Sequence, residues 1–413
     1  MDRAASHKSA FLLALLTLAA LGLRLVGLGY SLPHRPDDDS VAVSQAQILR
    51  RIWRGETVES RSPLYYPLLL GAIAAATGVC QPRELGPEPA TLSAHVAAAS
   101  RPFRGMRALV AVLSTACVLA MYLLARRFLG RGEALLAAAF LATSLLHLDF
   151  SRQARPHAPA VTFAVIALPA ILRAHARPGP WAYIWAGVAA GLAAATLQTG
   201  AAVALPLGLS CAVHLRRQRS AALPAVLAAG LCCAAITLAA YFHPYPREGA
   251  ALFSVQPGRL IISGHPAELT LFNGRGFARL ARYFLSYDPL VLGLALLGTG
   301  LLALRAWRAR AWRGPPGRVA LLLAHAGPYF VVFGLFSWIS DRFALPLLPH
   351  VALLASVGVA WLADRLPPSR LGSPAARLAA AGALALLLPT AAATSLVVQQ
   401  TRLDTEQQAA RFV

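Results

Sequence analysis

Carboxylates are scarce in this chain, with 17 Asp and Glu among 413 residues against 38 Lys and Arg. Charged residues of both signs make up 13% of the sequence, whereas soluble domains typically contain about 25%. Hydrophobic residues account for 57%, and the mean hydropathy is +0.57. This composition excludes an ordinary soluble domain.

Neither the cysteines nor any common cofactor motif indicates a metal or cofactor site. None of the five cysteines stands in a CxxC pair or beside His at metal-ligating spacing, so structural thiols are expected rather than a metal centre. Walker A, GxSxG, zinc and Rossmann motifs are also missing. An enzyme built on this chain would need its activated substrate to arrive from the lipid phase.

Long apolar runs recur from one end of the sequence to the other. Each has about 17–25 residues, enough to cross a hydrocarbon core of about 30 Å. The predicted spans are 9–29, 107–126, 133–149, 157–173, 182–197, 199–215, 221–242, 289–305, 319–338, 342–363 and 375–397. We therefore predict an all-α, polytopic membrane protein with about eleven transmembrane helices.

Arginine placement predicts the topology. The net charge of +21 is spread over short loops, which is typical of cytoplasmic loops and not of a nucleic-acid-binding face. With a cytoplasmic N-terminus, the arginine-rich loops are cytoplasmic if Ser62–Gly78, which contains Pro63 and Pro67, does not cross, and they are all external if it does. The first assignment agrees with the rule that arginine-rich short loops are cytoplasmic, so Ser62–Gly78 is predicted to be a juxtamembrane or re-entrant helix on the outer face.

This topology places two long segments on the outer face. They are 30–106 and 243–288, and we expect them to carry the site of a single transmembrane domain covering 1–413. The sequence shows no internal repeat and no low-complexity linker that would indicate a second domain.

Three adjacent carboxylates, Asp37, Asp38 and Asp39, follow the first span. The stretch "DDDSVAVSQAQILRRIWRGE" predicts an amphipathic interfacial helix, and its first residues suit helix capping, with Asp39 the nearest candidate for the cap. Capping requires only one Asp. Adjacent carboxylates raise one another's pKa, a cost that fits a site for a proton or a cation. Both interpretations stay open on composition alone.

Several cationic residues are candidates for a site on the same face. Arg24 lies inside the first span, where an unpaired charge is expensive. Arg152, Arg155 and Arg247 lie near the outer ends of spans, and His265 lies in "ISGHP". Each alone is explained by contact with lipid phosphate or by an ordinary polar contact. Together with the carboxylates they predict a site that binds a lipid phosphate and activates a hydroxyl.

The order of several short stretches resembles a known family. They are "LRLVGLGYSLP", "HRPDDDSV", "SPLYYPLLLGAI", "SRQARPHAP", "GVAAGLAAATLQTG", "HPYP" and "RFALPLLPHVALL". The chain resembles membrane glycosyltransferases of the GT-C type, in particular the dolichyl-phosphate-mannose–protein mannosyltransferase-like and aminoarabinose-transferase-like family.

The resemblance implies an inverting hexosyl or pentosyl transferase at the external face of a bacterial inner membrane. Its partners would be a polyprenyl-phosphate sugar donor, a lipid, glycan or protein acceptor, and membrane lipids, with no nucleic acid. An acidic residue of the first external loop would be the catalytic base, here Asp37-Asp38 or Asp38-Asp39. No cofactor is specified, and a divalent cation is left open.

Because the chain departs from the family pattern, two alternative functions stay open. Relatives often carry a Lys after the fifth span, where this chain has Ala195-Thr196-Leu197-Gln198, so any phosphate contact must come from Arg elsewhere. A lipid-linked saccharide flippase or transporter is the main rival, although nearly acid-free spans and the lack of repeats argue against it. An inactive membrane scaffold is the third alternative.

Overall fold

The computed structural model describes residues 2–32, 37–56, 67–81, 92–241, 253–256, 259–262, 265–266, 268–308, 317–368 and 372–402. Nine helical segments in this part are long and apolar enough to cross a membrane. Their helices are α1 (Asp2–Leu25), α4 (Leu92–Ala125), α7 (His157–Ala176), α9 (Ala204–Gln218, preceded by the 3-10 helix η1, Gln198–Val203), α10 (Leu223–Tyr241), α12 (Pro289–Arg308), α13 (Arg318–Leu335), α14 (Leu348–Ala363, preceded by the 3-10 helix η5, Asp341–Leu347) and α16 (Pro374–Thr401). The predicted all-α, polytopic class is confirmed.

At two of the eleven predicted spans, the helix in the structure is shorter than any of these nine segments. Helix α5 (Arg131–Thr143) has 13 residues and α8 (Pro180–Thr196) has 17, which correspond to about 20 and 26 Å. Helix α5 is packed against α4, α14 and α16, and α8 lies between α7 and α10. A break at Ser144 separates α5 from the short helix α6 (Leu145–Phe150). The count of eleven crossings stays a prediction.

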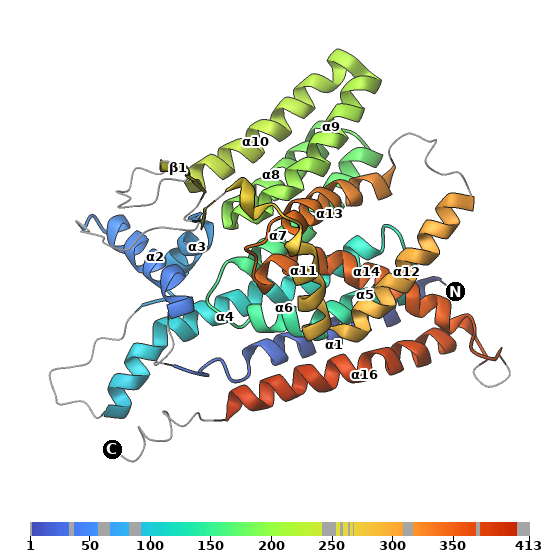
Figure 1. Cartoon of the computed structure of the whole chain (residues 1–413), viewed down its shortest axis with the longest axis horizontal. Coiled ribbons are helices and arrows are strands. Elements are labelled where there is room, and N and C mark those ends of the chain that lie inside the picture. The colour runs from blue at the N-terminus through green and yellow to red at the C-terminus, as the bar shows by residue number, and fades with distance from the viewer. Residues whose placement is uncertain are drawn as a thin grey trace.

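The long helices run roughly side by side, and some of the smaller elements lie at one end of the bundle (Figure 1). At the left end in that view lie α2 (Asp37–Trp53), α3 (Leu69–Thr77) and a small antiparallel sheet of order β1-β2-β3, whereas the N-terminus lies at the right. The strands are β1 (Phe253–Gln256), β2 (Arg259–Ile262) and β3 (His265–Pro266). Helix α11 (Arg275–Tyr287) leads into the start of α12.

Helix α3 is too short to cross a bilayer. Its nine residues rise about 14 Å, less than half of a hydrocarbon core. Instead it packs on α2, whose Ala42, Val43 and Ala46 are buried in one apolar cluster with Leu70 and Ala74 of α3. Helix α3 is thus too short to span by itself, and because residues 62–66 lie outside the described residues, the non-spanning character of Ser62–Gly78 stays a prediction.

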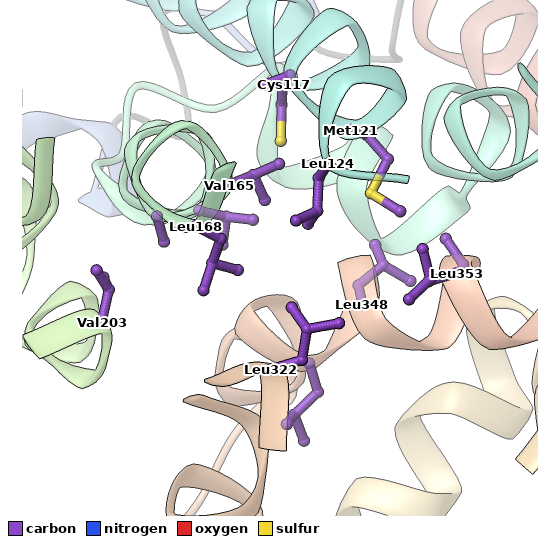
Figure 2. Close-up of a cluster of buried hydrophobic side chains, with 14 of the residues drawn as sticks. Cys117, Met121, Leu124, Val165, Leu168, Val203, Leu322, Leu348 and Leu353 are labelled. Atoms are coloured by element: carbon purple, nitrogen blue, oxygen red, sulfur yellow. The ribbon is translucent and has the colours of Figure 1, made fainter. Parts of the chain in front are cut away.

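The main core lies where α4, α7, α13 and α14 converge. Figure 2 shows its side chains pointing toward one another: Cys117, Met121, Leu124, Val165, Leu168, Val203, Leu322, Leu348 and Leu353. Between α12 and α14, a Cβ on Gly298 would collide with the carbonyl oxygen of Leu354, so glycine permits the close approach of these two helices. All five cysteines lie within the described residues, and each is a free thiol.

Candidate functional site

The Asp triplet forms the first turn of α2 at the same end of the bundle as α3 and the sheet (Figure 1). Because α2 already begins at Asp37, Asp39 is the third helical residue, and its predicted role as the helix cap is wrong. Acidic residues in a first helical turn are stabilised by the positive end of the helix dipole, which favours the ionised carboxylate. The backbone therefore holds three carboxylate-bearing residues within a single turn.

The C-terminal end of α1 is surrounded by three buried arginines: Arg24, Arg107 and Arg152. We call them the arginine cluster. Arg24 and Arg152 are 0% exposed and Arg107 is 3% exposed. They come from α1, α4 and the turn after α6, so the fold assembles them from distant parts of the sequence. This is an unusual concentration of positive charge in a protein interior.

Backbone carbonyls near the end of α1 accept hydrogen bonds from all three side chains. Arg24 Nη1 donates to the carbonyl oxygen of Ala20 at 2.9 Å, and Arg152 Nη1 donates to that of Leu23. Arg107 Nη1 donates to the carbonyl oxygens of Leu28 at 2.9 Å and Tyr30 at 2.8 Å. These carbonyls lie at a helix C-terminus, where cations are favoured.

A histidine completes the inner side of the cluster. Arg24 Nη2 lies 2.9 Å from Nδ1 of His147, which is also fully buried. Since guanidinium nitrogens only donate, Nδ1 must accept and the imidazole proton must sit on Nε2. His147 is thereby held neutral in one tautomer and adds no negative charge to the cluster.

Neither Arg24 nor Arg152 has a carboxylate at ion-pair distance within the described part of the chain; the ion pair found there joins Arg51 and Glu56. Three of their buried nitrogens, Arg24 Nε, Arg152 Nε and Arg152 Nη2, have no hydrogen-bond partner. Burial lowers the pKa of Arg152, and the neighbouring Arg107 lowers it further against the opposing effects of Tyr30 and Asp149. The cluster therefore has both the charge and the free donors to bind an anion.

Helix α6 positions His147 and Arg152, and a buried carboxylate fixes where α6 starts. Asp288, 4% exposed at the corner between α11 and α12, accepts a hydrogen bond from the Ser144 hydroxyl at 2.6 Å. It also accepts one from the backbone N–H of Leu145 at 3.1 Å. Asp288 therefore supplies acceptors for the first turn of α6 from a residue far along the sequence.

We expect Asp288→Ala to lower the midpoint of thermal unfolding markedly. The change leaves the Ser144 hydroxyl and the Leu145 N–H buried without an acceptor, at a cost of about 3–6 kcal/mol for two hydrogen bonds to a charged group. Thermal melts in detergent measure it, with Asp364→Ala, which removes an exposed carboxylate at the end of α14, as the matched control. Equal midpoints for the two variants would contradict this role.

A second polar group lies beside the cluster. Asp149 of α6 is half-buried and accepts a hydrogen bond from Gln153 Nε2 at 3.2 Å. A second carboxylate, Asp341, accepts a hydrogen bond at its Oδ2 from the Tyr287 hydroxyl at 2.7 Å. The charged neighbours of Asp149 are Asp341, Arg152 and Arg155. Arg155 is thus an electrostatic neighbour of Asp149 rather than a member of the arginine cluster.

The remaining predicted site residues are not brought to the cluster by the described structure. His265 pairs with Ile262 in the small sheet, and Arg247 lies outside the described residues. Arg107 and His147 were not among the residues predicted for the site. For Arg107 the signal was an arginine at the very start of a predicted span, and for His147 it was a histidine near the end of another. Within the described residues, no group of three His, Cys, Asp or Glu side chains is arranged to hold a metal ion.

Part of this sequence matches a known protein family, and the fold is similar to solved structures. Residues 90–242 match the family described as dolichyl-phosphate-mannose-protein mannosyltransferase. No curated protein matches the sequence. Among solved structures, the oligosaccharyltransferase of Archaeoglobus fulgidus in its apo form is similar, with 14% identity and a TM-score of 0.57. That match covers 96% of this chain and 56% of the archaeal chain.

Two further structures are similar at lower TM-scores. ArnT from Cupriavidus metallidurans bound to undecaprenyl phosphate has 17% identity and a TM-score of 0.46, covering 91% of this chain and 62% of that one. The Pmt1-Pmt2 complex of S. cerevisiae bound to the sugar donor has 19% identity and a TM-score of 0.40, covering 57% and 33%. The chain spans little more than half the length of the archaeal enzyme. The predicted resemblance to GT-C type, mannosyltransferase-like membrane glycosyltransferases is confirmed, and the archaeal match shows the shared fold.

Proposed function

We propose that this chain is a membrane glycosyltransferase that moves a sugar from a polyprenyl-phosphate donor to an acceptor at the outer face of a bacterial inner membrane. An Asp of the 37–39 triplet takes the proton of the acceptor, and the arginine cluster holds the donor phosphate. The observation that carries the proposal is the pair of buried guanidinium groups, Arg24 and Arg152, with three unpartnered nitrogens and no carboxylate at ion-pair distance in the described residues.

A lipid phosphate would relieve the electrostatic cost of burying Arg24 and Arg152. Buried charges without counter-ions cost several kcal/mol each, and guanidinium groups match the oxygens of phosphate with charge-assisted, often bidentate hydrogen bonds. Arg24 and Arg152 offer three nitrogens for such bonds. Because the end of α1 is also the end of a membrane span, a polyprenyl chain in the bilayer would bring its phosphate to this depth.

The same cluster would stabilise the transition state of sugar transfer more than the bound donor. A polyprenyl-phosphate sugar is a phosphodiester with one negative charge, and the polyprenyl phosphate released from it is a monoester that carries up to two. Negative charge therefore grows on the phosphate as its bond to the sugar breaks. A fixed group of cations stabilises this developing charge more than the starting donor, which lowers the barrier to transfer.

The bond changes are those of a single inverting displacement. The acceptor hydroxyl oxygen attacks the anomeric carbon, the Asp carboxylate takes the hydroxyl proton, and the anomeric C–O bond breaks. The electron pair of that bond leaves with the lipid phosphate. General base catalysis of this kind contributes roughly 10²–10⁴-fold.

Entry to the cluster requires movement of the residues that cover it. The Arg107 guanidinium carbon lies 4.3 Å from the centroid of the Tyr30 ring, and that of Arg152 lies 5.9 Å from it. At Gly27, an added Cβ would meet Arg152 Nη2 at 3.2 Å and Thr401 of α16 at 3.0 Å. Tyr30 and the end of α16 therefore cover the cluster, and we expect Tyr30 to swing away when the donor phosphate enters.

The family description supports the donor class. It names a dolichyl-phosphate sugar as the donor in that family, and dolichyl phosphate is a polyprenyl-type lipid phosphate. The matched region, 90–242, includes Arg107, His147 and Arg152 of the cluster.

The direct test is release of the lipid phosphate. The full chain, reconstituted in liposomes, is supplied with synthetic undecaprenyl-phosphate hexoses and pentoses and with an envelope extract as the acceptor. Mass spectrometry should detect undecaprenyl phosphate that is absent from protein-free liposomes. Intact donors throughout, together with no thermal stabilisation of the protein by undecaprenyl phosphate, would refute the proposal.

The topology that the proposal requires is testable independently. Single cysteines at positions 128 and 217, and in the 305–318 loop at position 311, should be protected from a membrane-impermeant thiol reagent. Cysteines at positions 85 and 265 should react from outside, because the arginine-rich loops are retained in the cytoplasm. Labelling of positions 128 and 217 from outside would invert the bundle and separate the proposed site from the external acceptor.

A further inference from the structure

Helix α11 is strongly two-sided, and this feature is independent of the arginine cluster. Its buried face consists of Gly276, Leu280 and Phe284, which recur every four residues as expected for one face of a helix. This face packs on α13 and α12. A Cβ on Gly276 would collide with the carbonyl oxygens of Phe333 and Phe336, so the glycine allows α11 to lie directly on the end of α13.

The opposite face of α11 carries three arginines. Arg275, Arg279 and Arg282 are all exposed, and their spacing of four and three residues places them along one side of the helix. The sequence of α11, RGFARLARYFLSY, contains no carboxylate. Arg279 Nη1 reaches the carbonyl oxygen of Ile339 at 3.5 Å, a weak contact that leaves its charge uncompensated. We call this face the α11 arginine row.

The surroundings place the arginine row at a membrane–water boundary. Helix α13 exposes Phe330 at 45%, Val331 at 49% and Val332 at 48%, an apolar surface suited to lipid tails. Trp338, which follows the end of α13, is 55% exposed. Exposed Trp is typical of the level of the lipid head groups. Figure 1 shows α11 running across the direction of the long helices, as an interfacial helix would.

We propose that the α11 arginine row binds the head groups of anionic phospholipids in the adjoining leaflet. Three guanidinium groups on one line match the phosphates of neighbouring lipids, and guanidinium–phosphate pairs form charge-assisted, bidentate hydrogen bonds. The row distinguishes phosphatidylglycerol from phosphatidylcholine because the trimethylammonium group of the latter cancels its phosphate charge. Clusters of basic residues beside a membrane attract anionic lipids in this way.

Trp338 supplies a local probe of this surface. It precedes Ile339, whose carbonyl oxygen accepts hydrogen bonds from Arg279 and, at 3.0 Å, from Tyr283 Oη. Bromine on lipid tails quenches tryptophan fluorescence at short range. The part of the quenching that disappears in Trp338→Phe therefore belongs to this position, although the chain has seven tryptophans.

The experiment uses the full chain in nanodiscs with a small fraction of brominated phosphatidylglycerol or brominated phosphatidylcholine in a phosphatidylcholine background. We expect half-maximal quenching of Trp338 at a several-fold lower fraction of the glycerol lipid. Arg275→Gln/Arg279→Gln/Arg282→Gln should remove the difference, and the corresponding triple Lys variant should retain most of it.

The charge-matched control replaces three exposed arginines at the opposite ends of helices, as Arg216→Gln/Arg305→Gln/Arg308→Gln, and should keep the full preference. Equal quenching by both lipids in the unchanged protein would overturn the proposal. It would also be overturned if the preference survived in the triple Gln variant of α11, or if undecaprenyl phosphate, but not phosphatidylglycerol, were concentrated there.

Discussion

Asp38→Asn is expected to reduce sugar transfer by about 10²-fold or more while the protein stays folded and still binds donor. The size of the loss is that of general base catalysis. Asn keeps the shape of Asp but cannot take a proton from the acceptor hydroxyl. Asp38 belongs to both possible acidic pairs, Asp37-Asp38 and Asp38-Asp39, so it is the first choice for the base, and Asp37 is the second.

The structure makes this substitution easier to interpret. Helix α2 is held by buried Ala42, Val43 and Leu49 on α3 and α4, none of which the change touches. Because α2 begins before Asp38, the residue is not the cap, so loss of capping cannot account for a large effect. A folded Asp38→Asn variant without activity would therefore indicate chemistry rather than helix stability.

The measurement is release of undecaprenyl phosphate with a matched donor and acceptor, alongside donor binding by thermal shift. Glu56→Gln is the control: Glu56 follows the end of α2, is exposed and pairs with Arg51 at 2.8 Å, and its loss should leave transfer unchanged. A fall of only a few-fold in all three variants, Asp37→Asn, Asp38→Asn and Asp39→Asn, would rule out the base and leave the triplet as a solvated helix start.

Hydropathy predicted the helical architecture well because the bilayer imposes it, whereas the topology predicted from arginine placement stays a prediction. Each long apolar run must be helical to satisfy its own backbone, and the predicted 289–305 and 319–338 correspond to α12 and α13. The boundary at 107 was wrong by contrast, since α4 begins at Leu92 and continues through Pro102. Polar residues outside the hydrocarbon core extend a helix without any hydropathy signal.

Features that depend on distant partners were out of reach of the sequence. The break at Ser144 is stabilised by Asp288, 144 positions further along, and nothing local to either residue reveals the contact. Arg24 was predicted as a candidate because an arginine inside a span is costly wherever it points. Arg107 and His147 were missed because their significance depends on lying beside Arg24 and Arg152 in space.

Arg152→Gln is expected to weaken binding of undecaprenyl phosphate by about 10–100-fold, the value of hydrogen bonds to a charged group. Arg152 is fully buried and has two nitrogens without partners, so Gln loses both the charge and the free donors. The measurement is the ligand-induced rise in unfolding temperature. A ligand at 100 times its Kd stabilises a protein by about 2.7 kcal/mol, and a hundredfold loss of affinity removes most of that.

The control separates binding from structural support. Arg308→Gln, at the exposed far end of α12, should leave the ligand-induced shift unchanged. Arg155→Gln should have a smaller effect than Arg152→Gln, because Arg155 is half-buried beside Asp149 rather than in the cluster. Arg247→Gln tests the third predicted phosphate contact in the same assay.

A purely structural Arg152 would behave differently. Its Nη1 donates to the carbonyl oxygen of Leu23 at the end of α1, so its loss should lower the unfolding temperature of the ligand-free protein in either case. If that were its whole role, the additional stabilisation by undecaprenyl phosphate would persist in Arg152→Gln. Arg152→Lys gives the intermediate case, since it keeps the charge but loses the two-nitrogen geometry. An unchanged ligand shift in both variants would show that the arginine cluster supports the end of α1 and does not bind the donor phosphate.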